Sequence, residues 1–322
     1  LRLNGGWLEA TGSLSVPTDL GTPGQPNSQA IASAGPAIHE VTHTPALPAA
    51  SQPVVVTAQV NDPDGVKNLT LNYRLDPATT YTTVTMSDRG TDGDAVAGDG
   101  VFSAVIPGQA ANQLVAFYIS ATNNFGVATR FPVLLNDNTP ARECLVLFGD
   151  GNPGGSFGVY HLWLTQANVT RWANLGNLSN EGIDGTMVYA NRVIYNMQAH
   201  YAGSPVHQGY NTPTGNLCSY KWIFNDDDQF LGATSFNKIH VPGNTDNDPT
   251  YQREQLANSF LRALGVPWLN RRDVVVYVNG NRRGPFMEDA QTPGSDLVKE
   301  YFPSDTDGYL YKVTRWYEFV PF

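Results

Sequence analysis

Apolar and polar positions alternate with a period of two through the middle of the chain. The stretch 54–60, which reads Val-Val-Val-Thr-Ala-Gln-Val, shows this pattern clearly. Such alternation is typical of a strand with one face in a core. Segments of this kind, each bounded by turn residues, cover 54–60, 69–75, 82–86, 100–106, 114–121 and 127–131. Short strands at this spacing predict an all-β sandwich between residues 47 and 139.

The expected sandwich is immunoglobulin-like in its number and spacing of strands. No Cys…Trp…Cys pattern accompanies it, so we expect apolar packing alone to hold its two sheets together. Residues 1–46 before it lack periodicity over most of their length and have the composition of a linker. We expect the sandwich to pack independently of a further unit, residues 140–322, that begins near Ala141.

The pattern after Ala141 changes to a mixture of strands and helices. Thr165 is a suitable N-cap for a helix over 165–175. A second helix follows Asp248 and Pro249, and Gly265 ends it. Its apolar positions recur every four residues, which predicts a buried stripe formed by Leu256, Phe260 and Leu264. The predicted strands of this unit are 143–148, 159–164, 184–189, 193–199, 220–224, 273–278 and 284–288.

Two turns define hairpins within this unit. Ala190-Asn191 joins the strands on either side of it, and Asn279-Gly280 is a strong signal for a tight hairpin turn. Pro285 lies inside the last predicted strand and cannot donate a ladder hydrogen bond, so that strand must be kinked or at an edge.

Composition and charge exclude several functions. Lys and Arg number 19 against 29 Asp and Glu, so the net charge is −10, which disfavours binding to nucleic acid. No apolar run is long enough for a membrane helix, so we expect no membrane insertion. Cys144 and Cys218 have no metal-ligand spacing; they are either two separate buried thiols or one disulfide. The abundance of Asn, Gly and Thr suggests a secreted or cell-surface protein.

An acidic, glycine-rich loop lies between the third and fourth predicted strands of the sandwich. It contains Asp88, Asp92, Asp94 and Asp99, whose carboxylates are the hard oxygen ligands that Ca²⁺ prefers. The spacing differs from that of an EF-hand, because no Glu occupies the twelfth position. We therefore consider either a Ca²⁺ site or a solvated loop whose Asp side chains cap their own backbone.

Several short motifs after residue 218 occur in the order and spacing of a known family. They are Ser219-Tyr-Lys-Trp-Ile-Phe224, Gln229-Phe-Leu-Gly232, Gln252-Arg-Glu-Gln-Leu-Ala257 with Leu264-Gly-Val-Pro267, Tyr277-Val-Asn-Gly280, Gly284 with Glu288, and Asp307-Gly-Tyr-Leu-Tyr-Lys312. Together they resemble the amino-terminal portion of CotH-type proteins, the spore-coat-protein-H family of atypical protein kinases. The resemblance implies an α+β kinase-like N-lobe in residues 140–322.

The resemblance also implies roles for individual residues. Lys221 would bind the phosphates of ATP, with Glu254 as its partner on a helix and Glu288 near the nucleotide. Mg²⁺ or Mn²⁺ would accompany the ATP, and protein side chains would be the substrate. The family's catalytic aspartates are expected beyond Phe322, so the chain itself is expected to be inactive. Without the resemblance, the residues favour an exposed strand lysine at Lys221 and an ordinary surface charge at Glu254.

The beginning of the chain carries a weaker resemblance. Gly21-Thr-Pro-Gly-Gln-Pro-Asn27 is similar to the closing segment of bacterial lamin-tail domains, and an ordinary linker explains it as well. Lamin-tail and immunoglobulin-like segments are accessories of adhesion proteins. The alternative to a kinase fragment is therefore a structural or adhesion protein of the cell surface or extracellular matrix, with a degenerate kinase-like module.

Overall fold

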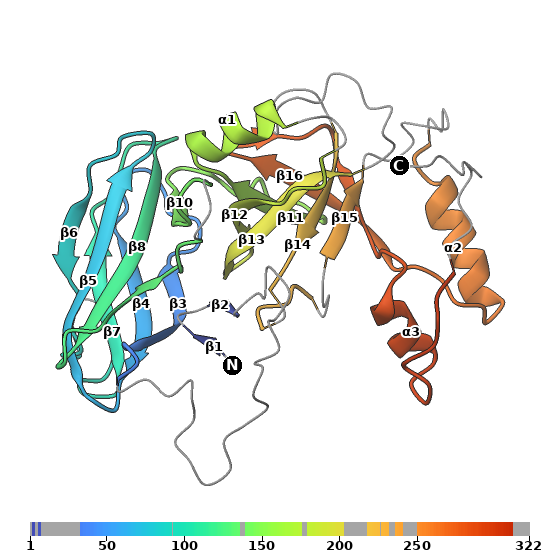
Figure 1. The fold of residues 1–322 in the computed structure, drawn as a ribbon. Helices are drawn as coiled ribbons and strands as arrows, with labels where there is room; N and C mark the ends of the chain where they lie inside the picture. The colour runs from blue at the N-terminus through green and yellow to red at the C-terminus, as the bar shows by residue number, and fades with distance from the viewer. Residues whose placement is uncertain are drawn as a thin grey trace, which may run out of the picture.

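The structure is a computed structural model of the 322-residue chain. It describes residues 2–3, 6–7, 33–91, 93–135, 139–175, 179–202, 218–225, 227–231, 236–240 and 250–311. These residues are rich in β-strands and contain three short helices, arranged as a sandwich beside a second β-sheet unit (Figure 1). A short antiparallel pair, β1 (Arg2–Leu3) and β2 (Gly6–Trp7), lies near the N-terminus. The described helices include none that is both apolar enough and long enough to cross a bilayer.

Two antiparallel sheets form the sandwich. The smaller has the order β3-β4-β7, from β3 (Ala37–Thr44), β4 (Val54–Asn61) and β7 (Val101–Ile106). The larger has the order β10-β8-β5-β6, with β9 also paired to β8; its strands are β5 (Val66–Leu75), β6 (Thr82–Thr85), β8 (Leu114–Asn123), β9 (Ala128–Phe131) and β10 (Cys144–Leu147). The inward side chains of β4 pack against those of β5 and β8, as the alternating pattern predicts.

Two strands of the sandwich correct the sequence-based boundaries. β3 lies in the segment that we interpreted as a linker, yet it pairs with β4 along most of its length. β10 lies in the segment that we assigned to the following unit, but Cys144–Leu147 pairs with β8 of the sandwich. The predicted strand 143–148 is therefore present, but its assignment to the second unit is wrong. An apolar strand buried on both faces carries no signal for the sheet that it joins.

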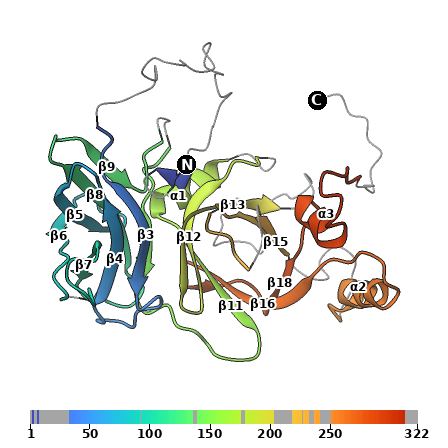
Figure 2. The ribbon, with the colours of Figure 1, turned by 90° about the horizontal axis from the view of Figure 1, so that it is seen from below.

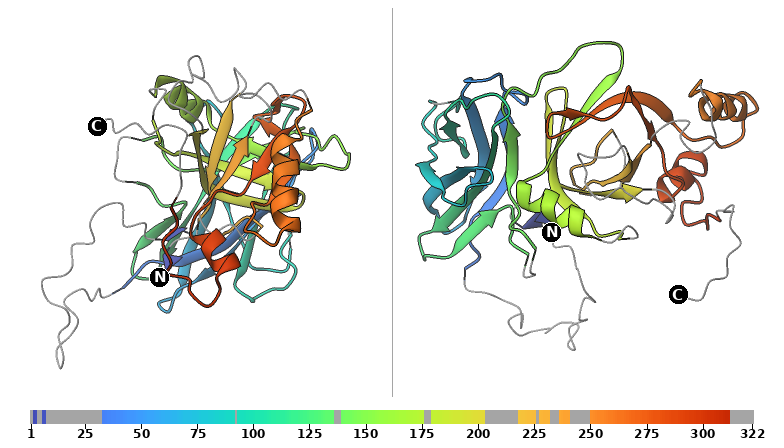
Figure 3. Two further views of the ribbon diagram at one scale, coloured as in Figure 1. Left: turned by 90° about the vertical axis from the view of Figure 1, so that its right-hand side faces the viewer. Right: turned by 90° about the horizontal axis from the view of Figure 1, so that it is seen from above.

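The second unit is a closed β-barrel. Its strands follow the order β11-β12-β13-β14-β15-β18-β16, and β16 pairs in parallel with β11 to close the ring (Figure 3). The strands are β11 (Gly158–Trp163), β12 (Ile183–Tyr189), β13 (Arg192–Ala202), β14 (Ser219–Ile223), β15 (Phe236–His240), β16 (Arg271–Val278) and β18 (Met287–Ala290). The predicted turn at Asn279-Gly280 is present, but it joins β16 to β17 (Asn281–Arg282) and not to the predicted strand 284–288, and Pro285 lies in the bend before β18.

The three helices lie outside this ring. α1 (Gln166–Asn174) begins as predicted, because the Thr165 side chain accepts a hydrogen bond from Asn168 N, and its Trp172 packs into the barrel core. α2 (Arg253–Ala263) contains no buried residue; Leu256, Phe260 and Leu264 are 53%, 61% and 76% exposed. The predicted buried stripe is therefore wrong. The predicted start at Asp248 and Pro249 lies outside the described residues. α3 (Ser295–Tyr301) follows β18.

The sandwich and the barrel share apolar packing. Trp163 of β11, Val188 of β12, and Val193 and Tyr195 of β13 point out of the barrel and belong to the same buried cluster as the sandwich core. Figure 2 shows the two units side by side, with β3 near β12. The expected independence of the sandwich is therefore wrong. Cys144 and Cys218 are both free and buried, which settles the two alternatives in favour of separate thiols.

Candidate functional site

The acidic loop brings three of its four aspartates together. One carboxylate oxygen from each of Asp88, Asp94 and Asp99 lies within 4.8 Å of the others. Asp94 is only 5% exposed, whereas Asp99 is exposed. Asp92, the fourth predicted ligand, lies outside the described residues. Carboxylates this close repel one another, and a divalent cation is the natural complement of such a donor set.

Backbone N–H groups already use part of this acceptor capacity. Asp94 accepts hydrogen bonds from Gly90 N at 2.6 Å and Val96 N at 3.1 Å. Asp88 accepts from Gly98 N at 2.5 Å and Gly100 N at 2.9 Å. These bonds fold the loop tightly and offset some of the repulsion. Each carboxylate retains further lone pairs, so the loop fits both of the roles expected from its sequence.

The predicted nucleotide-binding residues lie on different parts of the barrel. Lys221 is on β14 between Tyr220 and Trp222, which belong to the barrel core, so alternation directs Lys221 to the outer face. Its neighbours across the ladders are His200 of β13 and Lys238 of β15. Burial lowers the pKa of His200, with a smaller contribution from the charge of Lys221.

The expected ion pair between Lys221 and Glu254 is not among those of the described residues. Glu254, on α2, pairs instead with Arg271 of β16. Arg271 also pairs at 2.6 Å with Glu288 of β18, whose side chain is 3% exposed. The structure therefore brings Glu254 and Glu288 together around Arg271, whose strand β16 is three strands along the sheet from the strand that carries Lys221.

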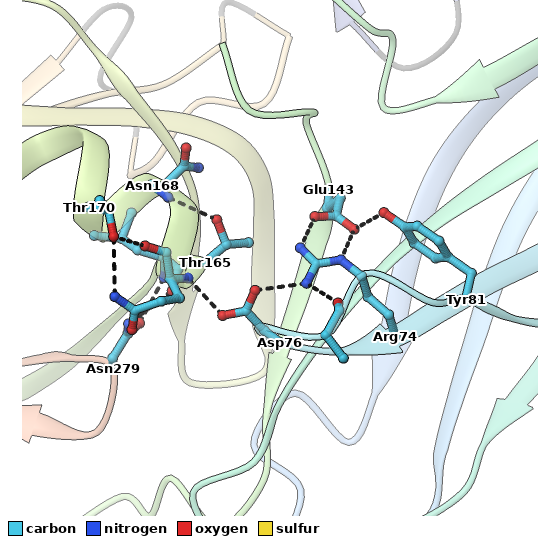
Figure 4. Close-up of polar contacts among 11 residues, drawn as sticks. Arg74, Asp76, Tyr81, Glu143, Thr165, Asn168, Thr170 and Asn279 are labelled. Carbon is cyan, nitrogen blue, oxygen red and sulfur yellow. Dashed lines mark hydrogen bonds and ion pairs between the residues drawn. The ribbon is translucent and has the colours of Figure 1, made fainter.

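A network of polar side chains joins the sandwich to the barrel (Figure 4). Arg74 of β5 donates to both carboxylate oxygens of Glu143, with Nε–Oε1 at 2.9 Å and Nη2–Oε2 at 2.5 Å. The Tyr81 hydroxyl donates to the same carboxylate at 2.5 Å. Burial raises the pKa of Tyr81, and the neighbouring Glu143 carboxylate raises it further, so this hydroxyl remains a donor. The three side chains fix the segment that leads into β10.

The same arginine connects this network to α1. Arg74 Nη1 donates to Asp76 Oδ1 at 2.9 Å, and Asp76 Oδ2 accepts from Gln166 N at 2.7 Å. Gln166 N is one of the free N–H groups at the start of α1, where a carboxylate is favoured by the helix dipole. A residue of the sandwich thus caps a helix that packs on the barrel, beside the cap that Thr165 supplies locally.

Further polar bonds cross between the units. Arg142 pairs with Asp184 of β12 at 3.1 Å, and Leu145 N donates to Thr186 Oγ1 at 3.1 Å. We call the buried contact between the sandwich and the barrel, with these bonds, the junction.

Two buried histidines lie at or beside the junction. His43 of β3 is 2% exposed; its Nδ1 lies 2.5 Å from the Tyr195 hydroxyl and its Nε2 lies 3.1 Å from Ala46 O. Its ring stacks on Trp163 with the centroids 6.1 Å apart. Burial lowers the pKa of His43 to about 4, against a smaller opposing contribution from the bond to Ala46.

His161 is the second of these buried histidines. It is fully buried on β11, and its Nδ1 lies 2.9 Å from Asp150 Oδ2. Trp163 Nε1 donates to the same oxygen at 2.8 Å. Sequence analysis missed both histidines. His43 and Tyr195 are 152 positions apart, and no motif places His161 beside Asp150, 11 positions before it.

Comparison with models of known protein families gives no match, and no curated protein matches the sequence.

Proposed function

We propose that the chain is a non-enzymatic structural module of a secreted or cell-surface protein, in which the sandwich and the barrel act as one rigid body. The observation that carries this proposal is the junction. Its apolar core is continuous with that of the sandwich, and the ion pair that crosses it, between Arg142 and Asp184, is mostly buried, with side chains 14% and 10% exposed. A rigid spacer that holds surface or matrix proteins at a fixed separation needs these properties.

The contacts at the junction differ from those of loosely tethered domains. Interfaces between mobile domains are small and polar, and relative motion is then expected. Here, large side chains such as Trp163 and Tyr195 are buried between the units, and a sandwich aspartate caps a helix of the neighbouring unit. Separating the units would expose the aromatic side chains and leave the Asp184 carboxylate without its partner Arg142. Both consequences oppose hinge motion.

Calcium binding by the acidic loop is a second part of the proposal. The cluster of Asp88, Asp94 and Asp99 supports it, because hard carboxylate oxygens suit Ca²⁺. Bound Ca²⁺ would neutralise their repulsion and stabilise the sandwich, which is a frequent requirement of extracellular modules. The proposed partners remain proteins of the cell surface or matrix.

The proposal does not extend to phosphoryl transfer by this chain. The kinase-like reading is supported by the order of the motifs around Lys221, Glu254 and Glu288. Against it, the helix glutamate that the resemblance assigns to Lys221 is engaged by Arg271. A kinase lysine must be held by that glutamate to position the phosphates of ATP. ATP with Mg²⁺ or Mn²⁺ therefore has no assigned role in the proposed function.

Two measurements on the purified chain test the proposal. Calorimetry should give a single unfolding transition whose calorimetric and van't Hoff enthalpies agree, because the two units would unfold together. Labelled ATP with Mg²⁺ or Mn²⁺ should give no incorporation of phosphate. Two separate transitions would contradict the rigid body, and label incorporation that Lys221→Ala abolishes would restore the kinase interpretation.

A further inference from the structure

The hydrogen bonds of His43 determine its protonation state at the junction. A carbonyl oxygen only accepts, so Nε2 carries the hydrogen that is donated to Ala46 O. Nδ1 is then unprotonated and accepts the hydrogen of the Tyr195 hydroxyl. Burial raises the pKa of Tyr195 well above its ordinary value, so this hydroxyl stays a neutral donor. Both ring nitrogens are satisfied, and the neutral imidazole fits its surroundings completely.

A protonated His43 would have no negative group in the described part of the chain to balance its charge. Protonation places a hydrogen on Nδ1, so the Tyr195 hydroxyl must turn its own hydrogen away. A buried charge also needs a counter-charge, and His43 forms no hydrogen bond or ion pair with a carboxylate of the described residues. The strands that surround it add only neutral groups: Tyr195 from β13 and Cys144 from β10, whose pKa burial raises well above its ordinary value.

Other polar and titratable groups near the junction already have partners. Trp163 of β11 stacks on His43 but donates its Nε1–H to Asp150. Asp150 also forms a hydrogen bond with His161, so its negative charge lies beside that imidazole. On β3 itself, His39 bonds to the Asn61 side chain and Glu40 is exposed. None of these groups takes up the charge of a protonated His43.

From this geometry we propose that the junction is an acid-sensitive latch, closed by neutral His43 between β3 and β13 and released when His43 becomes protonated. The inference goes beyond the proposed function, because it concerns how the contact between the units responds to pH. Opening the junction would let water solvate the imidazolium, so protons would bind the open form more tightly than the closed one. The latch would hold at neutral pH and weaken on acidification.

The expected size of the pH effect follows from the linkage between proton binding and opening of the junction. An imidazole pKa of about 4 in the closed form, against an ordinary value of about 6.5 in the open form, changes the opening equilibrium by about 100-fold between neutral pH and pH 4. Backbone amide hydrogen exchange, corrected for the intrinsic pH dependence of exchange, measures this opening. The strands to follow are β3 and β13, with β5 and β14 as references inside each unit.

His43→Gln keeps a donor and an acceptor but cannot titrate, and His39→Gln is the matched control on the same strand. We expect acid to accelerate exchange in β3 and β13 of the unmodified chain and of His39→Gln, and to have little such effect in His43→Gln. An equal acid response in His43→Gln, or an equal loss of protection in all four strands, would overturn the proposal.

A second measurement needs no variant. Nuclear magnetic resonance of the unmodified chain follows the titration of the His43 ring directly, with His39 as an internal reference. A midpoint near 4 for His43 supports the latch even if His43→Gln fails to fold. A midpoint near 6.5 would overturn it, because protonation would then cost the closed form nothing.

Discussion

Arg74→Met tests the energetic importance of the buried ion pairs in the sandwich that hold Asp76 against α1. Methionine keeps most of the apolar stem but removes the guanidinium that bonds to Glu143 and Asp76. The side chain of Glu143 is 3% exposed, so the substitution leaves a buried carboxylate whose remaining described partner is the Tyr81 hydroxyl. Breaking a buried pair in this way costs about 3–5 kcal/mol. That is a large part of the roughly 5–15 kcal/mol that stabilises an ordinary domain.

Urea unfolding of Arg74→Met and of the unmodified chain measures this loss. Arg192→Met is the matched control, because Arg192 and Asp228 form an exposed pair with side chains 45% and 33% accessible. The control should lose no more than about 1 kcal/mol. Adding Glu143→Gln to Arg74→Met should recover part of the loss, since the unpaired charge is removed. A loss in Arg74→Met as small as that of the control would refute the reasoning.

Four further outcomes are expected. Asp76→Ala should lower the free energy of unfolding by about 0.5–2 kcal/mol and speed amide exchange at Gln166, because α1 loses its cap from the sandwich; unchanged exchange there would contradict the role of Asp76. Millimolar Ca²⁺ should raise the melting temperature of the chain but not of Asp94→Asn, and a chelator should reverse the rise; equal responses of the two proteins would exclude the loop as the site. Leu162→Ala, in the barrel core, should cost about 2–5 kcal/mol, whereas Leu264→Ala, on the exposed face of α2, should change stability by no more than about 0.5 kcal/mol; urea unfolding that gave equal losses would show that α2 is covered. Since the pKa of His43 is lower in the folded chain, at about 4, than the ordinary 6.5 of an unfolded chain, its contribution to stability should be complete above about pH 6.5 and lost as the pH falls to 4, by up to about 3 kcal/mol; urea unfolding across this range should show the loss in the unmodified chain and not in His43→Gln.

The sequence correctly predicted those elements that depend on interactions between residues close together in the chain. Alternation in β4 and β8 identified strands, Thr165 identified the start of α1, and Asn279-Gly280 identified a hairpin turn in which both residues have positive φ. β3 was not predicted from the sequence, because its alternation is interrupted by an irregularity between His39 and Thr42, where Glu40 has a φ of 51°. A bulge of this kind removes the pattern while keeping the strand.

Tertiary relationships left little trace in the sequence. Arg74 and Glu143 are 69 positions apart, and each alone resembles an ordinary surface charge. The apolar stripe of α2 was correctly identified as a stripe, but periodicity cannot tell which face of a helix meets the protein. Gln255 and Asn258, on the polar side of α2, make its contacts with Asp273 and Leu269 instead. The closure of the barrel by a parallel pair of distant strands, β11 and β16, has no local signature either.

The central claim, that the sandwich and the barrel form one rigid body, is tested most directly by ¹⁵N relaxation of the intact chain. Amides in β4, β5 and β8 report on the sandwich, and amides in β12, β14 and β16 report on the barrel. If the junction is rigid, both sets will give the same overall correlation time at neutral pH, that of a single 35.0 kDa particle. Two distinct and shorter correlation times, one for each unit, would contradict the account.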